Sequence, residues 1–231
     1  MAKKYKHLFF DLDRTLWDFE TNSKITLQTI YKNRKLDRFF SSYDDFFEKY
    51  HANNVKMWED YKLRKITKNE LKVQRFALTL ENEGFVDDVL AEQIAEDYVV
   101  LSPEQTTLFP YAIESLKYLH QKYKLHIITN GFVEVQYKKL RNTKLDIFFD
   151  RVTTSEEAKA SKPNPEIFHN ALSAANAKKT ESLMIGDDWK SDILGAQKWG
   201  IDQVFFNPNK QKVDGKATFE IQSLAQLQEI L

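Results

Sequence analysis

Short runs of apolar residues alternate with helical patterns along most of the chain. The first run, Leu8-Phe9-Phe10, lies in the segment 6–13 and ends in acidic residues, which is typical of a short buried strand. Similar runs occupy 125–129, 182–185, 203–206 and 218–221, with a weaker one at 151–153. Between them, apolar residues recur every three to four positions from Ala112 to Tyr123 and after Pro165, which predicts helices. This alternation predicts an α/β fold with a doubly wound parallel sheet.

The stretch from about residue 22 to residue 101 has a different pattern, with helical periodicity throughout and no convincing strand. The segment 67–70, Thr-Lys-Asn-Glu, has the form of a capping box, and Gly84 is suited to end the helix that it opens. A final helix is expected near 87–101, before Pro103. One face of an earlier long helix is expected to consist of Phe47, Tyr50, Asn54, Trp58 and Tyr61. We therefore expect an all-helical insert, with these aromatic residues in its core.

Composition narrows the classes of function. The 231 residues include 34 basic and 34 acidic side chains, so a formal charge of zero provides no field that would attract a nucleic-acid polymer or an anionic membrane. The apolar run after the basic segment 1–5 is too short for a signal peptide or a membrane span, which indicates a cytoplasmic protein. The absence of cysteine excludes disulfides, thiolate catalysis and cysteine-ligated metals. Carboxylate chemistry remains as the candidate.

Four polar clusters lie at or just beyond the C-terminal ends of predicted strands. They are Asp11-Leu12-Asp13-Arg14-Thr15, Thr129-Asn130-Gly131, Lys162-Pro163 and Gly186-Asp187-Asp188. In an open parallel sheet, ligands bind at this edge. Segments that are distant in sequence are therefore expected to converge on one crevice.

The predicted crevice is rich in carboxylates. If Asp11, Asp13, Asp187 and Asp192 gather there, each pair about 4 Å apart repels by roughly 4 kcal/mol at an effective dielectric near 20. A divalent cation would relieve this repulsion, and an all-oxygen site with room for waters and a phosphate oxygen suits Mg²⁺. Lys162 would add further positive charge.

Residue types and spacing suggest separate roles within the crevice. Side chains at positions i and i+2 of an extended segment point the same way, so one of Asp11 and Asp13 can attack phosphorus while the other moves protons. The Thr129 hydroxyl, the Asn130 amide and the open backbone of Gly131 suit a phosphate cradle.

Two other features are ambiguous. Asp188 is better suited to cap a helix than to bind a metal directly. Trp17 and Phe19 could stack on a nucleobase near the site entrance, although aromatic residues at this spacing more often pack in a core.

The four clusters, in this order and with a later aspartate, resemble the haloacid dehalogenase-like hydrolase superfamily over the whole chain. The resemblance implies a Rossmann-like core, formed by residues 1–16 and 102–231, with an inserted helical cap at residues 17–101. It also implies an aspartyl-phosphate intermediate and Mg²⁺ as the cofactor.

The resemblance further implies a role for each matching residue. Asp11 would be the nucleophile and a metal ligand, and Asp13 the acid/base that also offers its backbone carbonyl to the metal. Thr129 and Lys162 would hold the phosphate. Asp187 would be another ligand, and Asp192 would orient metal-bound water.

The segments 8–13, 162–168, 191–193 with 195–196, and 206–208 look like the pyrimidine 5′-nucleotidase branch of the superfamily. This resemblance implies a small phosphomonoester substrate, with uridine or thymidine monophosphates as first candidates. Arg14 departs from the small or acidic residue common at its position, which leaves the detailed substrate open.

Alternative functions remain at this stage. The same motifs occur with phosphosugar phosphatase or mutase activity, because the sequence does not reveal whether water or a substrate hydroxyl accepts the phosphoryl group. A dehalogenase is disfavoured because Asp13 is present. A non-enzymatic phospho-receiver module also clusters Asp, Thr and Lys, but in a different order and on a shorter domain. The oligomeric state is not predicted.

Overall fold

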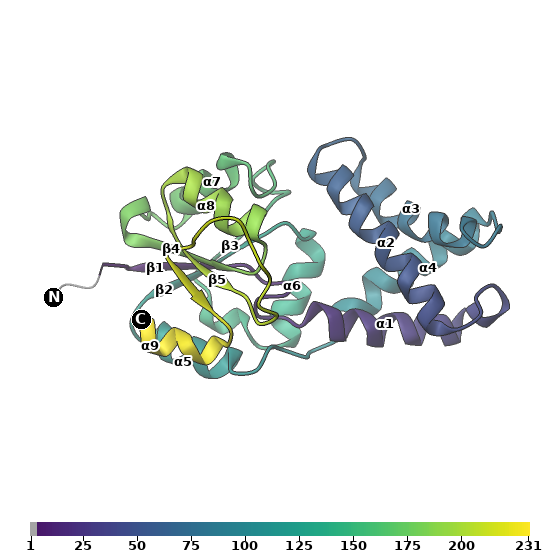
Figure 1. Cartoon of the computed structure of the whole chain (residues 1–231), viewed down its shortest axis with the longest axis horizontal. Helices are drawn as coiled ribbons and strands as arrows, with labels where there is room; N and C mark the ends of the chain where they lie inside the picture. The colour runs from purple at the N-terminus through teal and green to yellow at the C-terminus, as the bar shows by residue number, and fades with distance from the viewer. Residues whose placement is uncertain (1–3) are drawn as a thin grey trace. The chain divides into compact units, whose positions relative to one another are not determined.

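A single six-stranded parallel sheet forms the centre of the larger unit in the computed structural model, which describes residues 4–231 (Figure 1). Its strands are β1 (His7–Phe10), β2 (Lys124–Thr129), β3 (Arg151–Thr154), β4 (Ser182–Gly186), β5 (Asp202–Phe206) and β6 (Phe219–Ile221). Their order is β3-β2-β1-β4-β5-β6, and every neighbouring pair is parallel. The predicted α/β fold and its strands are thus confirmed. The basic segment 1–5 lies mostly outside the described residues.

Helices cover both faces of this sheet, which is why its strands read as unbroken apolar runs. The helices of this unit are α5 (Ala112–His120), α6 (Val133–Asn142), α7 (Pro165–Ala174), α8 (Gly195–Trp199) and α9 (Leu227–Ile230). Figure 1 shows α7 and α8 on one face and α5 and α9 on the other. On the first face, Phe168 of α7 packs in one cluster with Phe9 and Met184. On the second, Leu116 of α5 clusters with Leu8 and Phe10. Alternate residues of β1 therefore fill different cores.

The chain divides into two compact units, one containing residues up to Phe19 together with Thr106–Leu231 and the other Glu20–Gln105. The second unit is built from α1 (Phe19–Asn33), α2 (Tyr43–Lys62), α3 (Lys68–Glu81) and α4 (Asp88–Leu101). It has a hydrophobic core of its own. That this helical unit acts as a cap, with the boundaries 17–101, stays a prediction. Within residues 4–231, no helix is long and apolar enough to span a membrane.

The signals for helix ends in the second unit are confirmed. The Glu70 amide donates to the Thr67 hydroxyl at 3.2 Å, and the Thr67 amide donates to the Glu70 carboxylate at 2.7 Å, which completes the capping box. Gly84 follows the end of α3 with a φ of 82°, a conformation that glycine adopts without strain. Asp87 caps α4 by accepting the Leu90 amide at 2.9 Å.

The predicted inner face of α2 was wrong by one position. The buried residues of this helix are Phe46, Tyr50, Asn54 and Met57, whereas Phe47, Trp58 and Tyr61 are only partly buried. Both sets follow the spacing of three to four residues and share Tyr50 and Asn54, so periodicity alone could not separate them. In the observed arrangement, the inner face of α2 packs against α3, where the rings of Tyr50 and Phe76 lie with their centroids 5.0 Å apart.

Candidate active site

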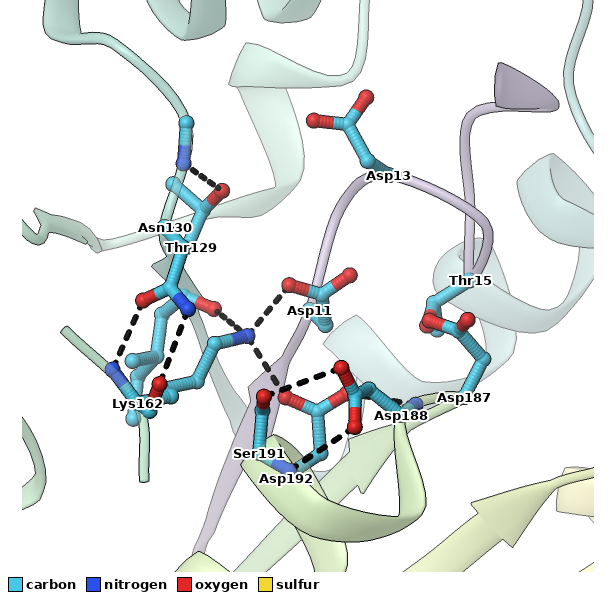
Figure 2. A network of polar contacts seen from close by, with 12 residues as sticks. Asp11, Asp13, Thr15, Thr129, Asn130, Lys162, Asp187, Asp188, Ser191 and Asp192 are labelled. Carbon is cyan, nitrogen blue, oxygen red and sulfur yellow. Dashed lines mark hydrogen bonds and ion pairs between the residues drawn. The ribbon is translucent and has the colours of Figure 1, made fainter. Parts of the chain in front are cut away.

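The sheet brings the four predicted clusters to one edge. Asp11 directly follows β1, and its amide donates to the Ile185 carbonyl of β4 at 2.9 Å. Thr129 ends β2, Gly186 ends β4 and leads into Asp187, and Thr15 donates to the Asp187 carboxylate at 3.1 Å. Figure 2 shows Asp11, Lys162, Asp187 and Asp192 gathered at this edge. The predicted convergence is therefore observed.

Lys162 is the cation at the centre of this arrangement, and its side chain is only 2% exposed. Its ammonium group pairs with Asp11 Oδ1, lies 2.7 Å from Asp192 Oδ1 and donates to the Ile128 carbonyl at 2.8 Å (Figure 2). Burial by itself would lower the pKa of Lys162, but the charges of Asp11 and Asp192 outweigh it and raise the pKa above its usual value. Lys162 is therefore a fixed positive charge in contact with the predicted nucleophile.

Three carboxylates form the part of the site that fits a cation. Asp11, Asp187 and Asp192 each place one oxygen within 4.8 Å of the others. Burial raises the pKa of Asp11 to about 7, with the charges of Asp192 and Asp13 adding to the rise and Lys162 offsetting part of it. The pKa values of the other two are also raised, chiefly by burial. Negative charge here exceeds what Lys162 can balance, so the donor set suits a hard divalent cation.

Asp13 lies apart from this carboxylate cluster. Its carboxyl group points away from Asp11 (Figure 2) and is held by two side chains of α6. Gln136 Nε2 donates to Oδ2 at 2.7 Å, and Lys139 Nζ donates to Oδ1 at 2.5 Å. The sequence analysis missed both partners, because two polar residues three apart on an amphipathic helix look like a solvated face. That the Asp13 backbone carbonyl binds a metal stays a prediction.

The Thr129-Asn130-Gly131 segment is arranged differently from the expected phosphate cradle. Thr129 Oγ1 accepts the Gly131 amide at 3.1 Å and the Gln136 amide at 2.9 Å. Asn130 uses its side-chain amide on the backbone of Lys162, donating to the carbonyl at 3.1 Å and accepting the N–H at 2.8 Å (Figure 2). Asn130 thus positions the Lys162 loop, and its role as a phosphate donor stays a prediction.

The backbone of Gly131 lies directly against the Gln136 side chain. A Cβ atom on Gly131 would lie 1.7 Å from Gln136 Nε2. The Gln136 side chain therefore occupies the space beside this backbone, and an approach of phosphate to Gly131 stays a prediction.

The loop after β4 ends in a π-helical turn, η5 (Trp189–Leu194). Asp188 caps this turn, accepting the Lys190 and Ser191 amides at 3.0 and 2.9 Å, so its predicted capping role is confirmed. Asp192 lies in the turn, and its second carboxylate oxygen accepts the Asp188 amide at 3.1 Å. A Cβ atom on Gly186 would lie 2.3 Å from that oxygen, so only glycine leaves room for Asp192 here.

Trp17 packs inside the sheet unit. Its side chain is completely buried in the hydrophobic core, and the Lys139 ammonium group lies 3.7 Å from the ring centroid. This placement favours the packing role over stacking on a nucleobase. Phe19 is partly buried, and the Arg14 guanidinium lies 4.1 Å above its ring, so a substrate role for Phe19 stays a prediction. Arg14 has a φ of 67°, and its charge offsets part of the rise in the pKa of Asp187.

Comparison with known proteins defines the class of this site. The family model for haloacid dehalogenase-like (HAD) hydrolases matches residues 5–200, and the chain belongs to that family. The pyrimidine 5′-nucleotidase YjjG of Escherichia coli is 33% identical over 99% of this chain and 98% of its own length. The pyrimidine 5′-nucleotidase PynA of Streptococcus pneumoniae is 30% identical over 98% of this chain and 95% of its own.

One solved structure is similar over its whole length. The structure of the HAD-hydrolase YfnB of Bacillus subtilis, which is bound to magnesium, matches with a TM-score of 0.89 and 29% identity, covering 99% of each chain. The Rossmann-like character of the sheet unit follows from this likeness and from the strand order.

Proposed function

We propose that this protein is a Mg²⁺-dependent phosphomonoester hydrolase that acts through an aspartyl-phosphate, with pyrimidine nucleoside 5′-monophosphates as its substrates. The observation that carries the proposal is the contact of Asp11 with the buried cation Lys162 inside a cluster of three carboxylates. The similarity to YjjG and PynA over nearly the whole chain supports the nucleotide substrate.

The cation would be held by Asp11 and Asp187, with Asp192 beside them. The carboxylate oxygens of these residues are the ligands that Mg²⁺ prefers, and their mutual repulsion is relieved by a dication. Bound Mg²⁺ would neutralise charge on the phosphate and allow an anionic nucleophile to approach it.

The residues of the chain would divide the reaction into two steps. In the first, a carboxylate oxygen of Asp11 bonds to phosphorus while the bond to the ester oxygen breaks, and the protonated form of Asp13 gives its proton to the departing alcohol. In the second, Asp13 takes a proton from water as the water oxygen bonds to phosphorus and the Asp11 carboxylate leaves. Lys162 and Thr129 would hold the phosphoryl oxygens throughout.

The helical unit Glu20–Gln105 would act as the cap that selects the alcohol portion of the substrate. Its separate hydrophobic core supports this role, because an independently packed unit can carry specificity without altering the sheet.

A phosphate-release screen tests the proposal. The purified protein, with Mg²⁺, is assayed on nucleoside monophosphates, sugar phosphates and pyrophosphate, and uridine or thymidine monophosphate should be turned over fastest. Removing divalent metal with a chelator should stop turnover, and added Mg²⁺ should restore it. Asp11→Asn should lower kcat by roughly 10⁴-fold without loss of fold, since it removes the nucleophile.

The control is Asp202→Asn, which alters a half-buried carboxylate that contacts Lys4 and Tyr5, none of them among the proposed site residues, and should keep full activity. Near-normal activity of Asp11→Asn would overturn the mechanism, and full activity in excess chelator would overturn the metal requirement. An isomerised sugar phosphate in place of free phosphate would indicate a mutase. Phosphate retained on the protein without turnover would indicate a receiver module.

A further inference from the structure

The carboxyl group of Asp13 is fixed by two neighbouring turns of α6. Gln136 and Lys139 are three residues apart, which places them on the same face of the helix. Gln136 Nε2 donates to one oxygen of Asp13 at 2.7 Å, and Lys139 Nζ donates to the other at 2.5 Å. Both oxygens of one carboxyl group are therefore held by side chains of one rigid element.

Burying the ammonium group of Lys139 is costly, and the contact with Asp13 offsets part of this cost. The side chain of Lys139 is 4% exposed, and an ammonium group removed from water loses most of its hydration. Asp13 is its ion-pair partner, and the faces of Trp17 and Phe19 lie 3.7 and 5.8 Å from Nζ. An exposed lysine would pair with Asp13 at a smaller cost, but it would not hold the carboxyl group in one place.

Gln136 links this arrangement to the phosphate side of the site. Its Nε2 group also donates to Thr129 Oγ1 at 2.9 Å, and the side chain is 1% exposed. Gly131, which has no side chain, leaves space for it beside the backbone. One amide therefore fixes the distance between the predicted acid/base and a predicted phosphate-binding hydroxyl.

We infer that Gln136 and Lys139 are positioning residues that hold the Asp13 carboxyl group on the side of the phosphoryl group from which the ester oxygen departs. The inference rests on the proposed function. In an in-line displacement, the entering and leaving oxygens lie on opposite sides of phosphorus. A proton donor for the leaving oxygen must therefore stand apart from Asp11, and the contacts to α6 hold Asp13 in such a place (Figure 2).

Substrates with different leaving groups test this role. The alkoxide of a nucleoside needs a proton as it departs, whereas p-nitrophenolate leaves without one. Because kcat/KM reports only the steps up to departure of the alcohol, Lys139→Met should lower it about 100-fold for uridine monophosphate and less than about threefold for p-nitrophenyl phosphate. With p-nitrophenyl phosphate, a burst of p-nitrophenol should also appear, because water is activated more slowly in the second step.

Asp13→Asn is the positive control for this experiment, and Arg141→Met is the negative control. Asp13→Asn should show the same dependence on the leaving group, because it removes the acid itself. Arg141→Met removes an exposed positive charge from the same helix and should leave both substrates unaffected. If Lys139→Met does not fold, Gln136→Met provides the same comparison with one donor removed.

The outcomes separate the inference from the proposed function. A wild-type protein that hydrolyses neither substrate would overturn the proposed function and the inference with it. A wild-type protein that hydrolyses both, with Lys139→Met and Gln136→Met changing the two kcat/KM values equally or not at all, would overturn the inference alone.

Discussion

Lys162 of the sheet unit and Arg75 of the helical unit are both almost completely buried, at 2% and 3% exposure, but their surroundings differ. Lys162 contacts two carboxylates, Asp11 and Asp192. Arg75 donates to the neutral oxygen Asn54 Oδ1 at 3.0 Å, and its guanidinium lies 4.7 Å from the ring centroid of Tyr98. Among residues 4–231, no carboxylate forms an ion pair with Arg75.

The difference follows from what each cation can do. A broad, weakly hydrated guanidinium can be buried among aromatic faces and amide oxygens, so Arg75 holds helices together without an anion. A compact ammonium is strongly hydrated and needs anions when it is buried. The anions around Lys162 are also the groups that we propose to react, so its charge contributes both to stability and to the chemistry.

The largest change is expected when the cation of the sheet unit is removed. Lys162→Met leaves Asp11 and Asp192 buried without their counter-charge, which should lower the free energy of unfolding by about 3–5 kcal/mol in the metal-free protein. Phosphatase activity should fall on the order of 10³-fold, because the positive charge beside the phosphate is lost. Urea unfolding and phosphate release measure the two effects.

Lys6→Met is the control for this variant. Its ion pair with Glu181 is exposed and should contribute less than about 1 kcal/mol. Equal losses of stability in Lys6→Met and Lys162→Met would mean that burial does not distinguish the two pairs.

A smaller effect is expected in the helical unit. Arg75→Met removes the contact with Tyr98 and leaves Asn54 Oδ1 without this donor, but it also removes a buried charge, so the cost should be about 1–2 kcal/mol. Arg34→Met, which breaks a partly exposed pair between the residue after α1 and Asp97 of α4, should cost less than about 1 kcal/mol. If Arg75→Met lowered the free energy of unfolding as much as Lys162→Met does, the proposed difference between the two buried cations would be wrong.

The buried base His126 should affect the free energy of unfolding only when the pH is lowered. His126 is 1% exposed and lies 3.0 Å from His7 Nδ1 through its Nε2 atom. Burial, aided by the nearby His7, lowers the pKa of His126 from 6.5 to about 4. Between those values the unfolded chain binds a proton that the folded protein does not, so stability should fall as the pH falls, by roughly 3 kcal/mol in all.

His126→Phe removes this titration while keeping a ring beside Phe9. The free energy of unfolding, measured between about pH 7 and pH 4, should then fall less steeply in the variant than in the wild type. The carboxylates of the site are present in both proteins, so their contribution cancels in this comparison. Parallel curves for the two proteins would contradict the role assigned to His126.

Much of the fold could be predicted because its signals are local. The strand 7–10 is buried on both faces, so it reads as an apolar run, and the motif residues come at the points where such runs stop. Convergence of Asp11, Lys162 and Asp187 followed from the parallel topology alone. The capping box at Thr67 needs only four residues, and it formed as predicted.

The rest depends on contacts that have no local signal. Gln136 and Lys139 are recognisable as buried partners of Asp13 only when α6 is placed beside the loop after β1. The choice of Phe46 over Phe47 depends on how α2 meets its neighbouring helices. The sequence also does not show that the Asn130 side chain holds the backbone of Lys162 through two hydrogen bonds.

The wide turn at 189–194 makes the site sensitive to a deletion in this loop. Both Asp192 and Ile193 direct their amides to the Asp188 carbonyl, so the turn contains one residue more than an α-helix would need. Deleting a single residue there would restore ordinary helical winding and rotate the following side chains by about 100°. If the deleted residue preceded Asp192, as Ser191 does, the Asp192 carboxylate would rotate away from Lys162 although no charged residue had been removed, so the site depends on the length of this loop as well as on its charges.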